Sequence, residues 1–346
     1  MPRRFVPGRA RHLRGSLLDP GSFCYDWAII DTEGRRDMEN GDLVADFTDT
    51  DFVTIGSFPH PTQMTVMPVV AMKGDYVRAV GTCFAISSQG LVLTARHVIE
   101  DALEIDAGGK MADPDMGIGA LYAAETGEED KLGGLLPARK LHFTSDLDIA
   151  LMQLNLPIAR ATGRPLRMPA LRLGTRIPRV GEQCAGIGYH AMEWQRATGV
   201  HTHHVLQKYA ASQGCVREVH LDKRDDFMVR FPCFRTDCEI VGGMSGGPVI
   251  ESRNGAVVGV MCSGVDVPEG ERPISYVSLA GTSLLLTLEA MDRESGAIEK
   301  KFLYDFVEGG AVATDGQFVV RSDRTVDGKR TLTLGFEGLD FTNRIR

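Results

Sequence analysis

The stretch TDCEIVGGMSGGPVI, from Thr236 to Ile250, holds the most distinctive pattern in the chain. Ser245 stands near its centre, with Gly243 two positions before it and a Gly-Gly-Pro run directly after it. Glycines permit the backbone of a tight turn and let another chain approach it closely. On such a turn the hydroxyl of Ser245 would be exposed, and nearby backbone N–H groups would converge on one point. The same letters would also suit an ordinary strand–turn–strand connection.

A histidine follows a second patterned stretch, GTCFAISSQGLVLTARHVIEDA, which runs from Gly81 to Ala102. The apolar run that ends at Thr94 and Ala95 predicts a strand, after which His97 opens a short helical turn. A histidine after a strand usually has a structural role, so this stretch alone does not define a site.

A carboxylate stands near the start of a third stretch, DLDIALMQL, from Asp146 to Leu154. Asp148 directly precedes an apolar run that predicts a buried strand, and burial of that strand would shield the carboxylate from water. Asp146 is the alternative, and its position suits a turn residue.

Together the three stretches resemble the chymotrypsin-type serine proteases. In that family the carboxylate begins a strand written D-I-A-L, which selects Asp148 over Asp146. The order His97, Asp148, Ser245, with spacings of 51 and 97 residues, is also that of the family, whereas subtilisins and α/β-hydrolases use other orders. The longer pattern T-D-x-x-I-x-x-G-x-S-G-G-P resembles the HtrA/Deg branch, which points to a bacterial type of enzyme. The resemblance covers residues 63–286.

The resemblance implies an all-β fold of two packed antiparallel six-stranded barrels. It implies a serine endopeptidase with His97, Asp148 and Ser245 as its catalytic triad, and with the backbone N–H groups of Gly243 and Ser245 as its oxyanion hole. Such an enzyme acts on a protein or peptide substrate and needs no metal or organic cofactor. The alternatives are a catalytically silent interaction module on the same fold and an acyl or ester hydrolase with the same triad.

Substrate preference depends on a residue six positions before the nucleophile, which in this family lies near the floor of the primary specificity pocket. Here that residue is Glu239, whose carboxylate would pair with a Lys or Arg before the scissile bond. The strand Val260-Met261-Cys262 is expected to flank the mouth of the pocket and to pair with the substrate backbone. A shift of one residue would instead turn Glu239 to solvent and leave an apolar pocket lined by Ile240 and Met261.

Three features depart from relatives within the family. Met244 precedes the nucleophile, where zymogen-type enzymes have an Asp that pairs with a newly cut N-terminus, so activation of that kind is not expected. Val98 stands where the usual disulfide needs a cysteine, which makes Cys83 a core thiol. No PDZ-like pattern follows Leu286.

The pattern of apolar runs divides the chain. We expect an N-terminal extension over residues 1–62, a first barrel over 63–156, a proline-rich linker over 157–178 and a second barrel over 179–286. Thr282 to Glu294 has helical periodicity, and the run DFMVRF from Asp226 to Phe231 reads as a strand. Residues 287–346 are expected to hold the end of that helix and a small β-rich tail, with FLYDFV, QFVVRS and RTLTLGF as its strands.

Composition limits the class of protein. The formal net charge is −8, which argues against a nucleic-acid partner. Seven cysteines without a paired framework indicate free thiols in a reducing compartment. No apolar stretch of about 18 residues occurs, so membrane insertion is not expected. No apolar run long enough for a signal peptide follows the arginine-rich start, so a signal peptide is not expected either. We therefore expect a cytoplasmic protein. An active protease there needs control, so the extension or a regulatory protein partner is expected to supply it.

Overall fold

The structure is a computed structural model. It describes residues 26–29, 52–54, 65–74, 76–106, 110–125, 131–159, 164–196, 203–265, 267–268, 270–291 and 296–344. The helices within these ranges are too short and too polar to cross a membrane.

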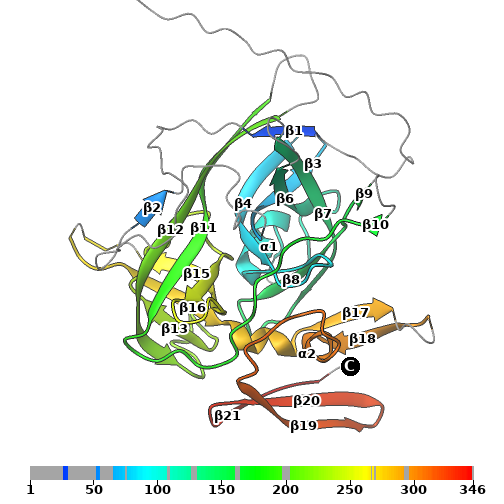
Figure 1. Ribbon diagram of the computed structural model, residues 1–346, viewed down its shortest axis with the longest axis vertical. Helices are drawn as coiled ribbons and strands as arrows, with labels where there is room; N and C mark the ends of the chain where they lie inside the picture. Colours follow the sequence, from blue (N-terminus) through cyan, green and yellow to red (C-terminus); the bar gives the residue numbers. More distant parts are fainter. Residues whose placement is uncertain are drawn as a thin grey trace, which may run out of the picture.

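Six strands close into the first barrel (Figure 1). Its ring order is β3-β4-β5-β8-β7-β6 and back to β3, and each of these pairings is antiparallel. The strands are β3 (Val66–Lys73), β4 (Tyr76–Ala85), β5 (Leu91–Thr94), β6 (Gly117–Glu125), β7 (Lys131–Phe143) and β8 (Ala150–Leu154).

Six further strands close into the second barrel, which lies beside the first. Its ring order is β11-β14-β15-β16-β13-β12 and back to β11, again antiparallel throughout. The two closed rings confirm the predicted fold class. The strands are β11 (Gln183–Arg196), β12 (His203–His220), β13 (Cys233–Thr236), β14 (Pro248–Glu251), β15 (Val257–Val265) and β16 (Ile274–Leu279).

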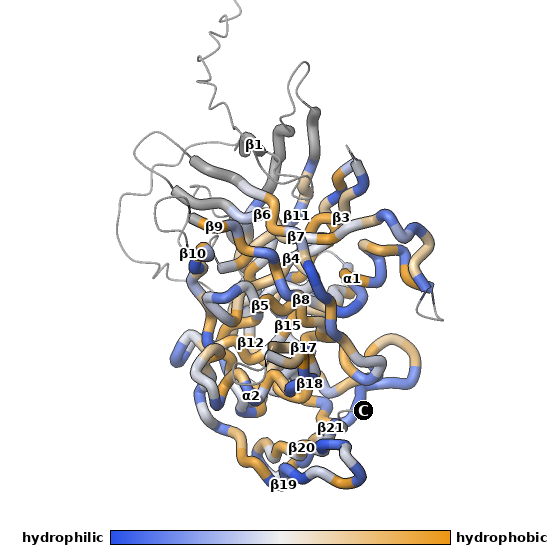
Figure 2. Tube along the Cα trace, turned by 90° about the vertical axis from the view of Figure 1, so that its right-hand side faces the viewer, coloured by the Kyte–Doolittle hydropathy of each residue, from blue (hydrophilic) through white to orange (hydrophobic). Residues whose placement is uncertain are grey.

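Apolar side chains fill both barrels. Every residue of β5 and β8 is buried, as the continuous apolar runs in those stretches predict. Figure 2 shows hydrophobic segments concentrated in the middle of the molecule, around β5, β8 and β15. Helix α1 (Arg96–Leu103) follows β5 directly and buries Val98, Ile99, Ala102 and Leu103. The residue that the helix presents at its start, His97, is thereby fixed to the rim of the first barrel.

The segment between the barrels has little regular structure. It contains the short pair β9 (Ile158–Ala159) and β10 (Arg164–Pro165), and beyond it Leu173 bridges to Val257. An ion pair also joins this segment to the second barrel, since Arg176 contacts the buried carboxylate of Glu251.

Two short strands of the N-terminal extension join the sheet. Strand β1 (Asp26–Ile29) runs parallel to β12 and antiparallel to β7, so it connects the second barrel to the first. Strand β2 (Phe52–Thr54) pairs with the middle of β12. The remainder of residues 1–62, including the arginine-rich start, lies outside the described residues.

The helix predicted over Thr282 to Glu294 is wrong beyond its first turn. A 3-10 helix, η2 (Ala280–Leu285), ends there, and β17 (Thr287–Met291) follows. Strand β17 pairs along its whole length with β18 (Ile298–Phe302). Hydrogen bonds to this neighbouring strand therefore override the local helical periodicity.

The tail differs from the prediction in one of its three runs. FLYDFV is mostly helix α2 (Leu303–Glu308) rather than a strand, because the carboxylate of Asp305 accepts the backbone N–H of Phe302 at the helix start. The other two runs form strands, and a three-stranded sheet follows α2 at the lower end of the view in Figure 1. Its strands are β19 (Phe318–Val326), β20 (Lys329–Phe336) and β21 (Leu339–Arg344).

The predicted strand from Asp226 to Phe231 is also wrong. Those residues form a turn, because one oxygen of Asp225 accepts the backbone N–H groups of Phe227, Met228 and Val229. These hydrogen bonds lower the pKa of Asp225 to about 2. The turn leaves Phe227 and Met228 exposed, which explains why their hydrophobicity misleads a strand prediction.

Replacing Arg176 by Met tests how the connecting segment is held. The change leaves the carboxylate of Glu251 buried and uncompensated, so we expect the free energy of unfolding to fall by about 3 kcal/mol. The double change Arg176→Met, Glu251→Met removes the buried pair and should recover most of that loss, because Glu182, the other partner of Arg176, still accepts the backbone N–H of Arg179. Urea denaturation of the three proteins measures it. An equal loss in the single and double variants would contradict this account of the segment.

Candidate active site

Two oxygens of one carboxylate hold His97. Oδ1 of Asp148 accepts the backbone N–H of His97 at 3.0 Å, and Oδ2 lies 2.8 Å from the ring atom Nδ1. The first contact fixes the start of α1, and the second fixes the orientation of the imidazole. With Nδ1–H donating to the carboxylate, Nε2 is left as the acceptor.

The two candidate aspartates have different surroundings. Asp148 is buried, with 6% of its surface exposed, just before β8. Asp146 is exposed and accepts the hydroxyl of Ser145, while Arg96 binds the carbonyl of Ser145. Asp148 is therefore the one of the two that contacts His97.

Asp148 also sets the charge state of the imidazole. Burial alone would lower the pKa of His97, but the hydrogen bond with Asp148 and the negative charges of Asp148, Asp101 and Glu100 together raise it above its usual value. The His97 side chain remains 35% exposed, so it can exchange protons with a bound molecule.

Ser245 stands on the tight turn that its glycines predict. The turn lies between β13 and β14 and contains two residues with positive φ, Gly243 (97°) and Gly246 (86°). A side chain at Gly246 would lie 2.2 Å from both the carbonyl oxygen of Thr82 and the hydroxyl of Thr94. Glycine at this position is what lets the turn pack against the strand that leads to His97.

The Ser245 hydroxyl donates to the carbonyl of Cys262 at 3.1 Å. Within the described part of the chain, it has no hydrogen bond to His97. Cys262 is in turn close to Asp148: burial raises the pKa of its thiol well above the usual value, and the Asp148 carboxylate raises it further. Cys262 therefore lies close to both Asp148 and Ser245.

The backbone N–H groups of Gly243 and Ser245 have no protein acceptor among the described residues. The neighbouring N–H groups do: that of Met244 donates to Val241, and that of Gly246 donates to Met261. These two donors lie on one turn beside a half-buried hydroxyl, which is what an oxyanion site would require.

Met244 is fully buried among the apolar residues of the second barrel. Its side chain therefore fixes the turn by packing. This is a different device from the ion pair that an Asp at this position would form.

The strand that was expected to flank the specificity pocket is buried in the second barrel. Val260 and Met261 are fully buried, and the N–H and carbonyl of Met261 are hydrogen-bonded to Gly247 and Gly246. Their main chain is thus already engaged inside the barrel. Within the predicted strand Val260-Met261-Cys262, it is Cys262 whose carbonyl accepts the Ser245 hydroxyl.

Glu239 and Ile240 point to opposite sides. Glu239 is exposed, and its backbone N–H donates to the hydroxyl of Ser212 at 2.7 Å. Ile240 is only 8% exposed and packs with the core of the second barrel, and its carbonyl lies against the backbone of Gly264.

Two residues at the site were not predicted from the sequence to act there in this way. The sequence predicts Cys262 only beside the substrate. It assigns no role to Thr82, which lies in the stretch from Gly81 to Ala102. A buried threonine within a strand motif is the one signal that could have found Thr82.

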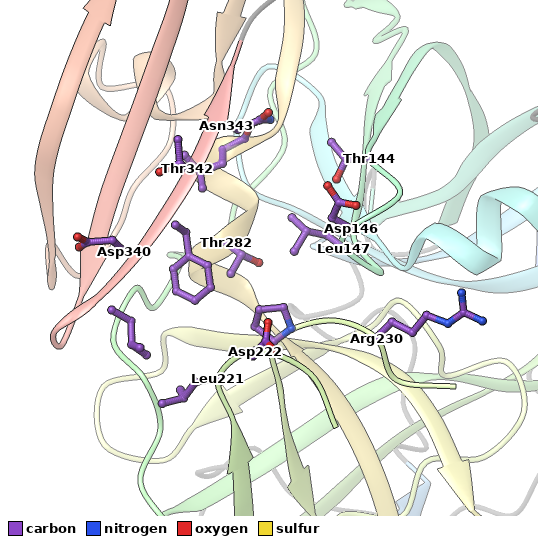
Figure 3. A pocket seen from close by; sticks show the side chains of 14 residues that line it. Thr144, Asp146, Leu147, Leu221, Asp222, Arg230, Thr282, Asp340, Thr342 and Asn343 are labelled. Atoms are coloured by element: carbon purple, nitrogen blue, oxygen red, sulfur yellow. The ribbon is translucent and has the colours of Figure 1, made fainter. Parts of the chain in front are cut away.

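A separate cavity of about 430 Å³ lies between the loop before Asp148, η2 and the C-terminal sheet. Figure 3 shows Thr144, Asp146 and Leu147 on one side of it, across from Thr342 and Asn343 of β21. His97, Asp148 and Ser245 do not line this cavity.

Comparison with known proteins gives one family. The model of the trypsin-like peptidase domain matches residues 81–260. A crystal structure of the MamO protease domain from Magnetospirillum magneticum, in its apo form, is similar to the chain. The two are 19% identical, the match covers 64% of this chain and 94% of that one, and the TM-score is 0.39. No curated protein matches the chain.

The His97 pKa can be tested directly. NMR titration of the imidazole should give a midpoint above the usual value of about 6.5, and Asp148→Asn should lower that midpoint, because burial is then opposed only by the charges of Asp101 and Glu100. Because the pKa of His97 is raised in the folded state, the contribution of His97 to stability is fully present below the pKa of the unfolded state. That contribution is lost as the pH rises through the pKa of the folded state. An unchanged midpoint in Asp148→Asn would show that the contact is not what shifts His97.

Proposed function

Since the chain belongs to the trypsin-like peptidase family, we propose that it is a serine endopeptidase that cleaves proteins or peptides through an acyl-enzyme. The observation that carries the proposal is the double contact of the Asp148 carboxylate with the backbone and ring of His97. That contact prepares an imidazole whose Nε2 can act as a base.

In the proposed mechanism, Ser245 attacks the scissile carbonyl while His97 accepts the hydroxyl proton and later gives it to the leaving amine. Asp148 keeps the imidazole in the required tautomer and stabilises the imidazolium. The N–H groups of Gly243 and Ser245 receive the negative charge that develops on the carbonyl oxygen. In comparable enzymes, removing one such donor costs about 100- to 1000-fold in turnover.

The hydroxyl of Ser245 must leave Cys262 before it can react. We propose that the substrate causes this step. A substrate N–H that donates to the Cys262 carbonyl competes for the same acceptor, so the hydroxyl turns toward His97. Hydrogen bonds of this kind are often completed only when the substrate is bound.

The same contact favours a second candidate function, a catalytically silent module of the same fold. If the Ser245 hydroxyl stayed on Cys262, the chain would bind peptides without cleaving them. An acyl or ester hydrolase is a further alternative, since the triad serves any acyl transfer. A fluorophosphonate probe separates the silent module from both hydrolases, because only an activated serine reacts with it.

Point changes test the proposed triad. Ser245→Ala should abolish peptide cleavage and probe labelling without unfolding the protein, since loss of the nucleophile costs about a millionfold in a comparable enzyme. Asp148→Asn should lower turnover by about 10⁴-fold through the wrong tautomer of His97. The matched control is Asp146→Asn, which should be mild because Asp146 is exposed. Equal losses in the two asparagine variants would refute the assignment of Asp148.

We also propose a preference for Lys or Arg before the scissile bond. Glu239 faces solvent, as the alternative has it, but Ile240 and Met261, which would line the alternative apolar pocket, are packed into the second barrel. Of the three side chains, Glu239 is therefore the one that a substrate can reach. An exposed carboxylate pairs weakly with a cation, by about 0–1 kcal/mol, so the preference is expected to be modest.

Peptide-library profiling checks this preference. Cleavage should favour Lys and Arg over Leu and Phe by several-fold, and Glu239→Ala should remove most of that difference while turnover of apolar substrates stays unchanged. Cleavage mainly after Val, Leu or Phe that Glu239→Ala leaves unaffected would rule the basic preference out.

We further propose that the enzyme works in the cytoplasm under the control of its extension or of a protein partner. The six cysteines described are free thiols, five of them buried, which suits a reducing compartment. Strands β1 and β2 of the extension pair with β12 of the second barrel, so the extension has a direct contact through which it can act.

A further inference from the structure

We propose that Thr82, a residue of the first barrel, is a positioning residue that holds the oxyanion-binding turn of the second barrel in its working shape. The inference rests on the proposed function and adds to it a residue that neither contacts the substrate nor transfers a proton.

Thr82 binds the turn at two points. It lies in β4 and is fully buried. Its hydroxyl donates to the carbonyl of Gly243 at 2.8 Å, and its backbone N–H donates to the carbonyl of Ser245 at 2.8 Å. One residue thus binds the carbonyls of the two residues whose N–H groups are the proposed oxyanion donors.

These two contacts complete the anchoring of the adjoining peptide groups. The peptide group after Gly243 is bonded at its oxygen by Thr82 and at its N–H by Val241. The peptide group after Ser245 is bonded at its oxygen by Thr82 and at its N–H by Met261. Because both groups are fixed at both ends, the donors next to them cannot easily rotate away.

The anchoring matters most at Gly243. Its φ of 97° lies in a region open to glycine, and glycine passes readily between conformations. Without a bond to its carbonyl, the peptide group after Gly243 could turn and take the neighbouring donor with it. The Thr82 hydroxyl supplies that bond from a part of the chain 161 residues away.

The Thr82 hydroxyl also has an acceptor role that an apolar side chain could not fill. The backbone N–H of Tyr189, on β11, donates to it at 3.0 Å. The backbone carbonyl of Thr82 accepts a hydrogen bond from the hydroxyl of Thr94 at 2.7 Å. Thr94 ends the strand that leads to His97. Thr82 therefore connects the turn that carries Ser245 with the strand that leads to His97.

The test compares Thr82→Val, which keeps the shape and removes the hydroxyl, with Thr82→Ser, which keeps the hydroxyl. The matched control is Thr282→Val. Thr282 lies in η2, outside the turn, and is also a buried threonine. Its hydroxyl donates to the carbonyl of Leu279. Thr82→Val loses the two hydrogen bonds of a buried hydroxyl and Thr282→Val loses one, but only Thr82→Val loosens the oxyanion-binding turn.

For the full-length chain we expect Thr82→Val to lower kcat by about 100-fold, the lower end of the loss for a missing oxyanion donor, with KM changed less than about twofold. A peptide boronate, which mimics the tetrahedral intermediate, should lose affinity by a similar factor. Thr82→Ser should restore most of both. Thr282→Val should lower only the unfolding temperature. Thr82→Val with unchanged kcat, or Thr82→Ser as impaired as Thr82→Val, would overturn the proposal.

A second measurement keeps this result apart from the proposed function. If the parent protein neither cleaves peptides nor reacts with a fluorophosphonate, the proposed function fails. The amide NMR signals of Gly243 and Ser245 still report on the turn. Large shifts or broadening of these signals in Thr82→Val but not in Thr282→Val would support the role of Thr82, and unchanged signals would refute it.

Discussion

The contact between Asp148 and His97 is the interaction on which the arrangement of the site depends. One carboxylate binds both the backbone and the ring of the histidine, so the start of α1 and the direction of the imidazole are set together. That carboxylate is buried at the edge of β8, whose five residues are all buried. The apolar interior of the first barrel is therefore what keeps the carboxylate out of water and strengthens its attraction to His97.

In the proposed triad the second barrel has to present Ser245 to this pair, and the turn that carries Ser245 is held by packing rather than by charge. Met244 fills the barrel interior directly before the nucleophile. An apolar anchor is formed when the chain folds and needs no new N-terminus. The turn is consequently expected to form in the uncut chain, and the proposed control of activity would then act by covering or altering the site.

The sequence was most informative where a motif fixes backbone geometry. The glycines around Ser245, the apolar run before His97 and the D-I-A-L run predicted a tight turn, a strand followed by a helical turn, and a buried strand. The structure has all three, since each depends on local conformation. Prediction failed where distant contacts decide. Residues after Leu285 form a strand because β18 lies beside them, and Asp226 to Phe231 form a turn because of a single carboxylate at Asp225. The link from Thr82 to Gly243 spans two barrels, so no local pattern carries it.

The pairing of β1 has a consequence for the order of events during synthesis. Trp27 is paired with His203, 176 residues later in the chain. The ribosome therefore releases β1, and also its first-barrel partner β7, long before its second-barrel partner β12 exists, and closing so large a loop costs conformational entropy. The first barrel can assemble before β12 is made, since its six strands all precede residue 155, and β1 can already pair with β7. Among the described strands, β1 is thus the first to be made, yet it joins the two barrels only after translation has passed His203.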